Sequence, residues 1–167
     1  MIIEGKNMET QIINYIQQNK EKHYRTAYSY VKNKEDALDI VQDSIVKALK
    51  YQRTLKDINH LNAWFYKILI NTAKTYLKKQ NRYIAVEDES LESYEPPTYD
   101  TYTNFELEEA LDHLSYKEKT IIALRYFNQF ELKEIATITD QNLSTVKSTL
   151  YRTLKKLKIL LEKEESV

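Results

Sequence analysis

Residues 130–158, FELKEIATITDQNLSTVKSTLYRTLKKLK, hold two apolar runs at helical spacing on either side of a polar turn. Ala136 is small enough to let two helices approach closely, and Val146 follows ten residues later, as a helix-turn-helix requires. Asp140 stands in the turn where glycine is common, and aspartate tolerates the positive φ needed there. The stretch predicts a helix-turn-helix, with a plain helical hairpin as the alternative. The packing residues are Leu132, Ile135 and Ala136 in the first helix and Val146, Leu150, Leu154 and Leu157 in the second.

Polar residues of the second helix lie on the side opposite its packing residues. In a helix-turn-helix, the N-terminal part of this helix enters the major groove of DNA. Arg152 could then pair with both acceptors of a guanine, and Lys155 could reach a phosphate. We therefore predict a duplex-binding face that consists of Thr145, Lys147, Ser148, Tyr151, Arg152 and Lys155.

The composition favours helices throughout the chain. With 167 residues, one glycine and two prolines, the chain has few residues for the tight turns of sandwiches and barrels. The formal net charge is zero, yet residues 1–83 carry +7, residues 84–109 carry −9 and residues 110–167 carry +2. Residues 84–104 hold both prolines and follow neither a helical nor a strand period. We predict an all-α protein of two small helical domains, residues 1–83 and 105–167, joined by a flexible acidic linker, residues 84–104.

Residue types that are rare or missing argue against several kinds of chemistry. Without cysteine there is no disulfide, thiolate zinc site or cysteine nucleophile. A single glycine argues against phosphate-binding loops and therefore against a nucleotide-dependent enzyme. His23, His60 and His113 are scattered, so we expect them on the surface or in turns and predict no metal site. No apolar run approaches the roughly 20 residues that span a bilayer. We predict a cytoplasmic protein that is not an enzyme and takes no cofactor or small-molecule ligand.

Two helices are predicted near the N-terminus. Apolar residues between Ile12 and Val31 follow helical spacing, and Asn33 offers a cap for a second helix from Lys34 to about Tyr51. This second helix is expected to bury six apolar residues, namely Ala37, Leu38, Val41, Ile45, Ala48 and Leu49. Its outward side carries what we call the acidic ridge, which consists of Asp39, Gln42 and Asp43. The ridge is either a docking surface for a basic partner or a solvated face.

A third helix, from Leu61 to about Tyr83, separates apolar and basic residues onto two sides. The basic side suits nucleic acid, although such a face can also be a plain solvated surface. Trp64, at the border of the two sides, either caps the core or meets a base. The polar side chains of the loop from Lys56 to Asn62 either hydrogen-bond the nearby backbone to form a turn or hydrogen-bond a base. The candidate single-strand contacts are Lys56, Asn59, His60, Asn62, Trp64, Lys67, Asn71, Lys74 and Lys78.

Three motifs together resemble the bacterial RNA polymerase sigma factors of the extracytoplasmic-function (ECF) group, and most of all its SigV-type members. DALDIVQDSIVKAL, residues 36–49, resembles the segment that binds core polymerase. NAWFYKILINTAKTYLKK, residues 62–79, is similar to the helix that melts the promoter and binds the −10 element. EIATITDQNLSTVKSTLYR, residues 134–152, resembles the reader of the −35 element. Together the motifs cover nearly the whole chain.

The resemblance implies a role for each face. The acidic ridge would contact the clamp helices of core RNA polymerase. The loop before the third helix and Asn71 would capture a flipped base of promoter DNA, with Lys74 and Lys78 along the strand backbone. Residues 105–167, a region 4-like domain, would read the −35 duplex near the polymerase flap, while residues 1–83 form a region 2-like domain. The resemblance further implies an envelope-stress response and a membrane-anchored anti-sigma factor.

The chain departs from the pattern of the family at four positions. Ile45 replaces a usual phenylalanine and Asp140 a usual glycine, and Thr149 and Leu154 stand where arginine is frequent. Fewer arginines predict weak binding to duplex DNA without polymerase. Two other functions remain open: a helix-turn-helix repressor or activator that is not a polymerase subunit, and a helical adaptor that binds no DNA.

Overall fold

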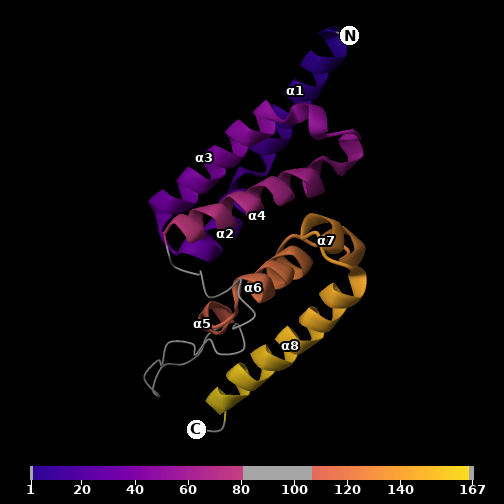
Figure 1. The fold of residues 1–167 in the computed structure, drawn as a ribbon. Coiled ribbons are helices and arrows are strands. Elements are labelled where there is room, and N and C mark those ends of the chain that lie inside the picture. Colours follow the sequence, from indigo (N-terminus) through magenta and orange to yellow (C-terminus); the bar gives the residue numbers. More distant parts are fainter. Residues whose placement is uncertain (1, 81–106, 166–167) are drawn as a thin grey trace. The chain divides into compact units, whose positions relative to one another are not determined.

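A computed structural model of the chain describes residues 2–80 and 107–165 (Figure 1). The chain divides into two compact units, Met1–Arg82 and Tyr83–Val167. Each described range is helical and neither contains a strand, which confirms the predicted all-α class. The predicted linker, residues 84–104, lies outside the described residues.

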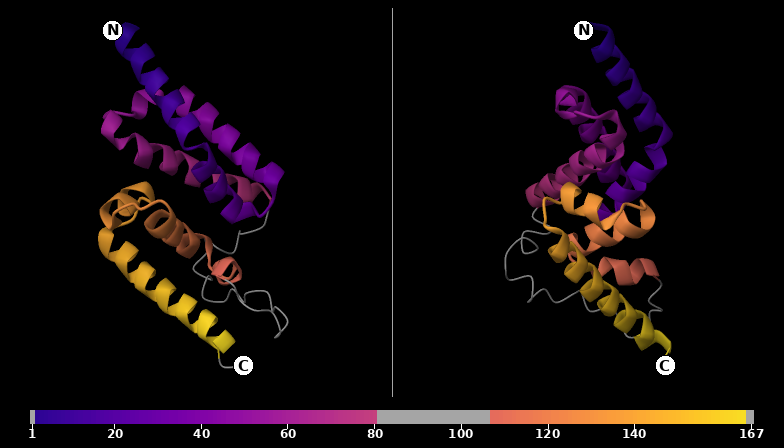
Figure 2. Two further views of the ribbon diagram at one scale, coloured as in Figure 1. Left: turned by 180° about the vertical axis from the view of Figure 1, so that it is seen from behind. Right: turned by 90° about the vertical axis from the view of Figure 1, so that its right-hand side faces the viewer.

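The described part of the N-terminal unit contains four helices: α1 (Ile2–Gln18), α2 (Lys20–Val31), α3 (Lys34–Lys50) and α4 (Leu61–Lys79). Two turns of 3₁₀-helix, η1 (Gln52–Thr54) and η2 (Ile58–His60), connect α3 to α4. In both views of Figure 2 the N-terminal end of α1 projects beyond the other helices of this unit. Its core lies where α2, α3 and α4 meet the C-terminal half of α1, around the fully buried Ile12, Ile40 and Phe65.

The single helix predicted from Ile12 to Val31 is wrong, because the chain forms two helices that meet at Asn19. Asn19 leaves helical geometry at ψ 14°. Its side-chain amide donates to the Tyr15 carbonyl at 2.8 Å, and the same oxygen accepts the Asn19 backbone amide at 3.1 Å. The apolar spacing continues across this break, so periodicity alone could not reveal it.

Asn33 caps α3 as predicted, because its side chain accepts a hydrogen bond from the Asp36 amide. The buried face of α3 differs from the prediction. Leu38 is 47% exposed, whereas Ile40 and Ser44 are fully buried. Ser44 tolerates burial because its hydroxyl donates to the Ile40 carbonyl at 2.7 Å. The buried stripe therefore contains Ala37, Ile40, Ser44 and Ala48.

The described part of the C-terminal unit contains α5 (Leu107–Asp112), α6 (Tyr116–Ile122), α7 (Leu132–Ile138) and α8 (Leu143–Glu165). Ser115 and Glu118 form a capping box at the start of α6. After α6 the helix widens into a π-helical segment, Ala123–Phe127. At its end the backbone amide of Asn128 donates to the Ala123 carbonyl at 3.0 Å.

The helix-turn-helix is formed by α7 and α8. Ile135 and Ile138 of α7 are buried, as are Val146 and Leu150 of α8. Asp140 adopts a φ of 53°, the left-handed geometry expected of it in the turn. Asn142 starts α8 by accepting the Thr145 amide at 2.8 Å. The turn therefore needs no glycine.

Candidate functional site

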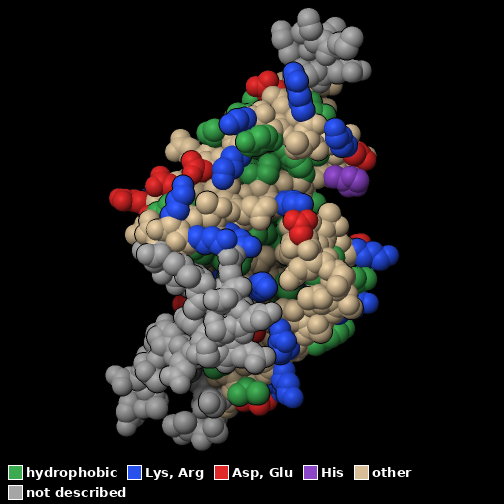
Figure 3. All heavy atoms as spheres, in the orientation of Figure 1, with side chains coloured by type: hydrophobic (Ala, Val, Ile, Leu, Met, Phe, Trp, Pro, Cys, Tyr) green, Lys and Arg blue, Asp and Glu red, His purple; other side chains and the backbone are tan. Residues whose placement is uncertain are grey.

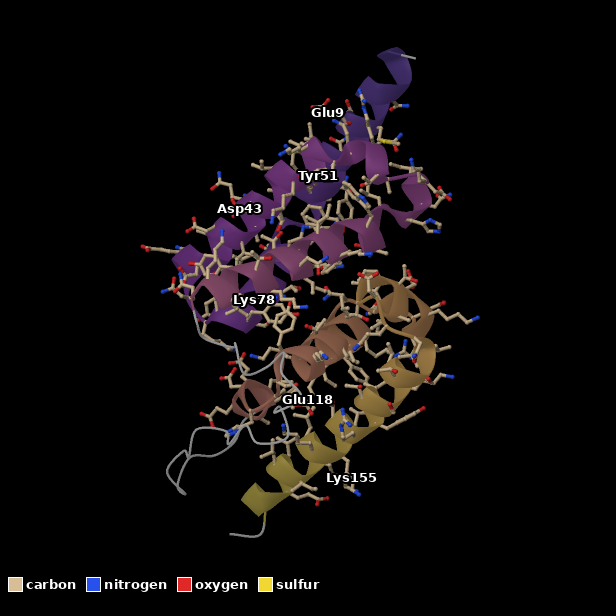
Figure 4. All side chains as sticks on the ribbon, viewed as in Figure 1. Glu9, Asp43, Tyr51, Lys78, Glu118 and Lys155 are labelled. Carbon is tan, nitrogen blue, oxygen red and sulfur yellow. The ribbon has the colours of Figure 1, made fainter. Side chains whose placement is uncertain are left out.

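The six residues of the predicted duplex-binding face are all exposed on α8. Tyr151 is 64% exposed, and Figure 4 shows Lys155 pointing away from the helices of this unit. The opposite side of α8 packs through Val146, Leu150 and Leu157. Thr149 is buried and Leu154 is half-buried, so both belong to the packing side. These two positions therefore serve packing in this chain, and weak binding to duplex DNA stays a prediction.

An ion pair fixes α8 against α6. Lys156 donates to Glu118 at 3.1 Å, and the Thr153 hydroxyl lies 3.5 Å from the second Glu118 oxygen. Burial alone would raise the pKa of Glu118, but hydrogen bonds from the Ser115 backbone and from Lys156 outweigh it and lower this pKa. Glu118 also belongs to the capping box of α6. One carboxylate therefore helps to start α6 and to fix which side of α8 faces α6.

The basic side of α4 is solvent-accessible along its length. Asn71 and Lys78 are exposed, and Lys67 and Lys74 are half-buried. Figure 4 shows Lys78 near the C-terminal end of α4. The buried stripe on the other side contains Phe65, Leu69, Ala73 and Leu77. This arrangement presents one amide and three cations in a row, which can follow the phosphates of a single strand.

The loop before α4 is anchored at both ends. Leu55 is 4% exposed and lies at the start of the loop, whose Lys56, Asn59 and His60 are exposed. The Asp57 carboxylate accepts the Asn59 amide at 3.0 Å and so caps η2. The half-buried Trp64 donates its indole N–H to the Thr54 hydroxyl at 2.9 Å, which ties η1 to α4. This bond gives Trp64 a structural role whether or not it meets a base.

The acidic ridge of α3 is exposed to solvent. Figure 3 shows acidic side chains gathered over α3, and Figure 4 shows Asp43 pointing outward. Asp39, Gln42 and Asp43 are exposed, and beside them lie Leu38 and Val46, which are 47% and 60% exposed. The surface therefore combines carboxylates with apolar side chains, a mixture that suits a partner with basic residues around an apolar patch.

Comparison with protein families assigns both units. A family described as Sigma-70 region 2 matches residues 15–83, and one described as Sigma-70, region 4 matches residues 104–157. The chain belongs to the sigma-70 family. The region 4 match covers the helix-turn-helix, and the region 2 match covers α2, α3 and α4 of this sigma-70 protein.

Curated relatives refine the assignment within the sigma-70 family. The chain is 47% identical to the RNA polymerase sigma factor SigV of Bacillus subtilis over 92% of its own length and 93% of the relative. It is 29% identical to the ECF RNA polymerase sigma-E factor of Haemophilus influenzae, covering 84% of the chain and 88% of that relative. These matches confirm the resemblance to the ECF group and to its SigV-type members.

Two solved structures share the fold. The sigma factor RpoE of Bartonella quintana, in complex with the anti-sigma factor NepR, matches with a TM-score of 0.65 at 24% identity over 89% of this chain and 97% of that one. CnrH, in complex with the cytosolic domain of CnrY, matches with a TM-score of 0.68 at 19% identity over 96% of both chains. At these identities the matches establish that the sigma-70 chain shares their all-helical architecture.

The histidines are distributed differently from the prediction. His60 is exposed, and His113 lies in the turn between α5 and α6 although it is only 4% exposed. His23 is fully buried within α2, so the expectation of a surface or turn position is wrong for His23. Across residues 2–80 and 107–165, acidic and histidine side chains form no group of three that could hold a metal ion. No helix in these ranges combines the length and apolar character needed to cross a membrane.

His23 links α2 to Tyr15 of α1 and to the start of α4, a connection that the sequence did not reveal. The Tyr15 hydroxyl lies 3.1 Å from Nε2 of His23 and donates to Oδ1 of Asn62. The His23 ring lies 4.4 Å from the Phe65 ring, measured between centroids. One candidate strand contact, Asn62, is therefore held by a buried histidine through a tyrosine.

Lowering the pH from about 6.5 to about 4 is expected to destabilise the N-terminal unit through His23. Burial lowers the pKa of His23 from 6.5 to about 4, and Lys22 adds to this effect. Above both values His23 is neutral in the folded and the unfolded chain, whereas between them only the unfolded chain binds the proton. The folded state therefore loses stability as the pH falls, by about 3 kcal/mol in total.

Urea denaturation of the wild type and of His23→Gln at pH 7.5 and pH 4.5 measures this effect. The variant should lose less stability than the wild type between pH 7.5 and pH 4.5. Protonation of carboxylates lowers the stability of the two proteins by the same amount, so the difference between them reports on His23. His60→Gln removes an exposed histidine and should keep the full decrease. An equal decrease in the wild type and in His23→Gln would show that His23 does not titrate in this way.

Proposed function

We propose that this chain binds core RNA polymerase and directs it to specific promoters as a sigma factor of the ECF group. The supporting observation is that a sigma-70 region 2 and a sigma-70 region 4 occupy its two compact units. Each unit carries an exposed polar face opposite its core. The proposed activity is recognition and binding without covalent chemistry by this chain.

In this proposal residues 1–83 bind polymerase and the −10 element, and residues 105–167 read the −35 duplex. Residues 84–104 connect the two. The basic side of α4 supports the first role, since strand capture needs a row of cations and accessible amides. Stacking one base is worth about 1–3 kcal/mol and flipping a base costs a few kcal/mol. Binding alone can therefore hold a promoter open once it has melted.

The acidic ridge is the proposed contact with the clamp helices of the polymerase. Its carboxylates are exposed on a helix whose other side is anchored in the core by Ala37, Ile40 and Ala48. We include the exposed Leu38 and Val46 in this contact, because interfaces gain most of their affinity from buried apolar centres. The polymerase flap is proposed to lie against residues 105–167.

An anti-sigma factor is the second proposed protein partner. The two solved structures described above contain an anti-sigma factor, NepR, and the cytosolic domain of CnrY, respectively. We propose that this chain is regulated in the same manner by a membrane-anchored anti-sigma factor, as part of an envelope-stress response. Binding to RNA polymerase places the proposed activity in the cytoplasm.

Run-off transcription tests the proposal. Bacterial core polymerase free of other sigma factors is incubated with a panel of promoter fragments, with and without the full chain. We expect discrete transcripts only when the chain is present. A repressor or activator would instead bind a palindromic duplex without polymerase and would give core polymerase no start-site selectivity. A helical adaptor would show no dependence on DNA.

A further inference from the structure

The contact between Tyr15 and Asn62 fixes which end of the Asn62 amide faces solvent. A phenol has one proton, and Tyr15 donates it to Oδ1 of Asn62. The amide oxygen therefore points toward α1. Asn62 is exposed, and among the described residues none accepts a hydrogen bond from its amide nitrogen. The outward end of this side chain offers two donors and no acceptor.

The direction of the hydrogen bond from Tyr15 to Asn62 determines the tautomer of His23. Since the Tyr15 proton is directed at Asn62, the hydroxyl oxygen must accept a hydrogen bond from Nε2 of His23, 3.1 Å away. His23 then carries its proton on Nε2 and leaves Nδ1 unprotonated. This agrees with the surroundings of Nδ1, which is buried and has no hydrogen-bond partner among the described residues.

Two hydrogen bonds, from His23 to Tyr15 and from Tyr15 to Asn62, form what we call the relay. Aromatic packing holds the relay in place. The His23 ring lies 4.4 Å from Phe65 and 5.2 Å from Tyr66, and the Tyr15 ring lies 5.7 Å from Phe65. Phe65 is fully buried in α4, one turn after Asn62. Neither the Tyr15 ring nor the His23 ring can rotate without disturbing this cluster, so the core sets the positions of the hydrogen-bonding atoms.

We propose that Tyr15 and His23 are positioning residues that hold the Asn62 amide nitrogen outward, so that Asn62 selects an unpaired base whose facing edge offers hydrogen-bond acceptors. The inference rests on the proposed function, because it places Asn62 against a promoter base. It assigns part of the base selectivity to α1 and α2, neither of which supplies a residue of the predicted strand contacts.

Two measurements test the relay. The first is the ¹⁵N NMR spectrum of the full chain without DNA, which identifies the tautomer of His23. We expect the proton on Nε2. A proton on Nδ1 would mean that Tyr15 donates to His23 instead of Asn62, which would overturn the inference. This measurement does not depend on polymerase or promoter binding.

The second measurement is the binding of polymerase with the full chain to forked promoter DNA, with all four bases tested in turn at each unpaired position. We expect a base preference at one position that Asn62→Ala abolishes and Tyr15→Phe reduces by about 3- to 10-fold. Adding Tyr15→Phe to Asn62→Ala should change nothing further, because the relay acts only through Asn62.

Two control variants separate positioning from stability. Tyr24→Phe removes the hydroxyl of another half-buried tyrosine and should keep the base preference. Lys78→Ala should weaken binding to all four bases equally. If Tyr15→Phe lowers affinity for all bases by the same factor, Tyr15 is only a structural residue and the inference is wrong. If the wild-type chain confers no promoter binding on polymerase, the proposed function fails and base selection by Asn62 fails with it, whatever the tautomer of His23.

Discussion

Replacing both Asp39 and Asp43 with lysine is expected to weaken binding to core polymerase by at least about 100-fold, because like charges facing each other across an interface cost several kcal/mol. Both side chains are exposed on α3. The substitutions leave the buried residues Ala37, Ile40 and Ala48 unchanged, so the helix should fold normally. Competition for a limiting amount of core polymerase against a labelled wild-type chain measures the loss.

A matched variant controls for net charge. Glu9→Lys with Glu21→Lys changes the charge by the same amount at exposed positions of α1 and α2. This pair should compete almost as well as the wild type. Equal losses from the two pairs would indicate a general effect of charge and would contradict the assignment of the acidic ridge as the contact.

Arg152→Ala is expected to lower the preference for the correct −35 sequence by about 5- to 150-fold, which corresponds to the 1–3 kcal/mol of a bidentate contact with guanine. Arg152 is exposed on α8, and the side of α8 that packs in the core does not include it. The measurement is the affinity of polymerase carrying the full chain for promoter fragments in which each −35 base pair is changed in turn.

Lys155→Ala provides the comparison. Lys155 is exposed one turn further along α8 and is assigned to a phosphate, so its loss should weaken binding to every sequence by the same factor (Figure 4). If Arg152→Ala behaves in the same uniform way, Arg152 contacts the backbone and the base is read by another residue.

The helix-turn-helix was predictable because its determinants are local. Val146, Leu150 and Leu157 recur at helical spacing and are buried, whereas Lys147, Ser148 and Arg152 are exposed on the other side of the helix. Asp140 was identified as the turn residue because few residue types tolerate its φ. Caps such as Asn33 and the Ser115–Glu118 box span only three residues and are equally visible in sequence.

Apart from the break at Asn19, which is local, the errors concern features that depend on distant residues. Leu38 and Ile40 are both apolar, and only the packing of α2 and α4 against α3 decides that Ile40 is the buried one. His23 is buried among aromatic rings of α1 and α4, and the Tyr15 hydroxyl that joins it reaches Asn62, 47 residues along the chain. Sequence periodicity contains no information about such contacts. The roles assigned to DNA- and polymerase-binding residues stay predictions.

The two sides of α8 carry separate tasks, and this has a consequence for how such proteins diversify. Thr149, Thr153 and Lys156 hold the helix through buried or half-buried contacts, whereas Lys147, Ser148 and Tyr151 face outward. Mutations on the outer side can therefore accumulate without weakening the fold. Under the proposed function, in which the outer side of α8 reads the promoter, duplicated copies of such a gene are free to drift toward new promoters. Randomising a few exposed codons would then retarget the chain.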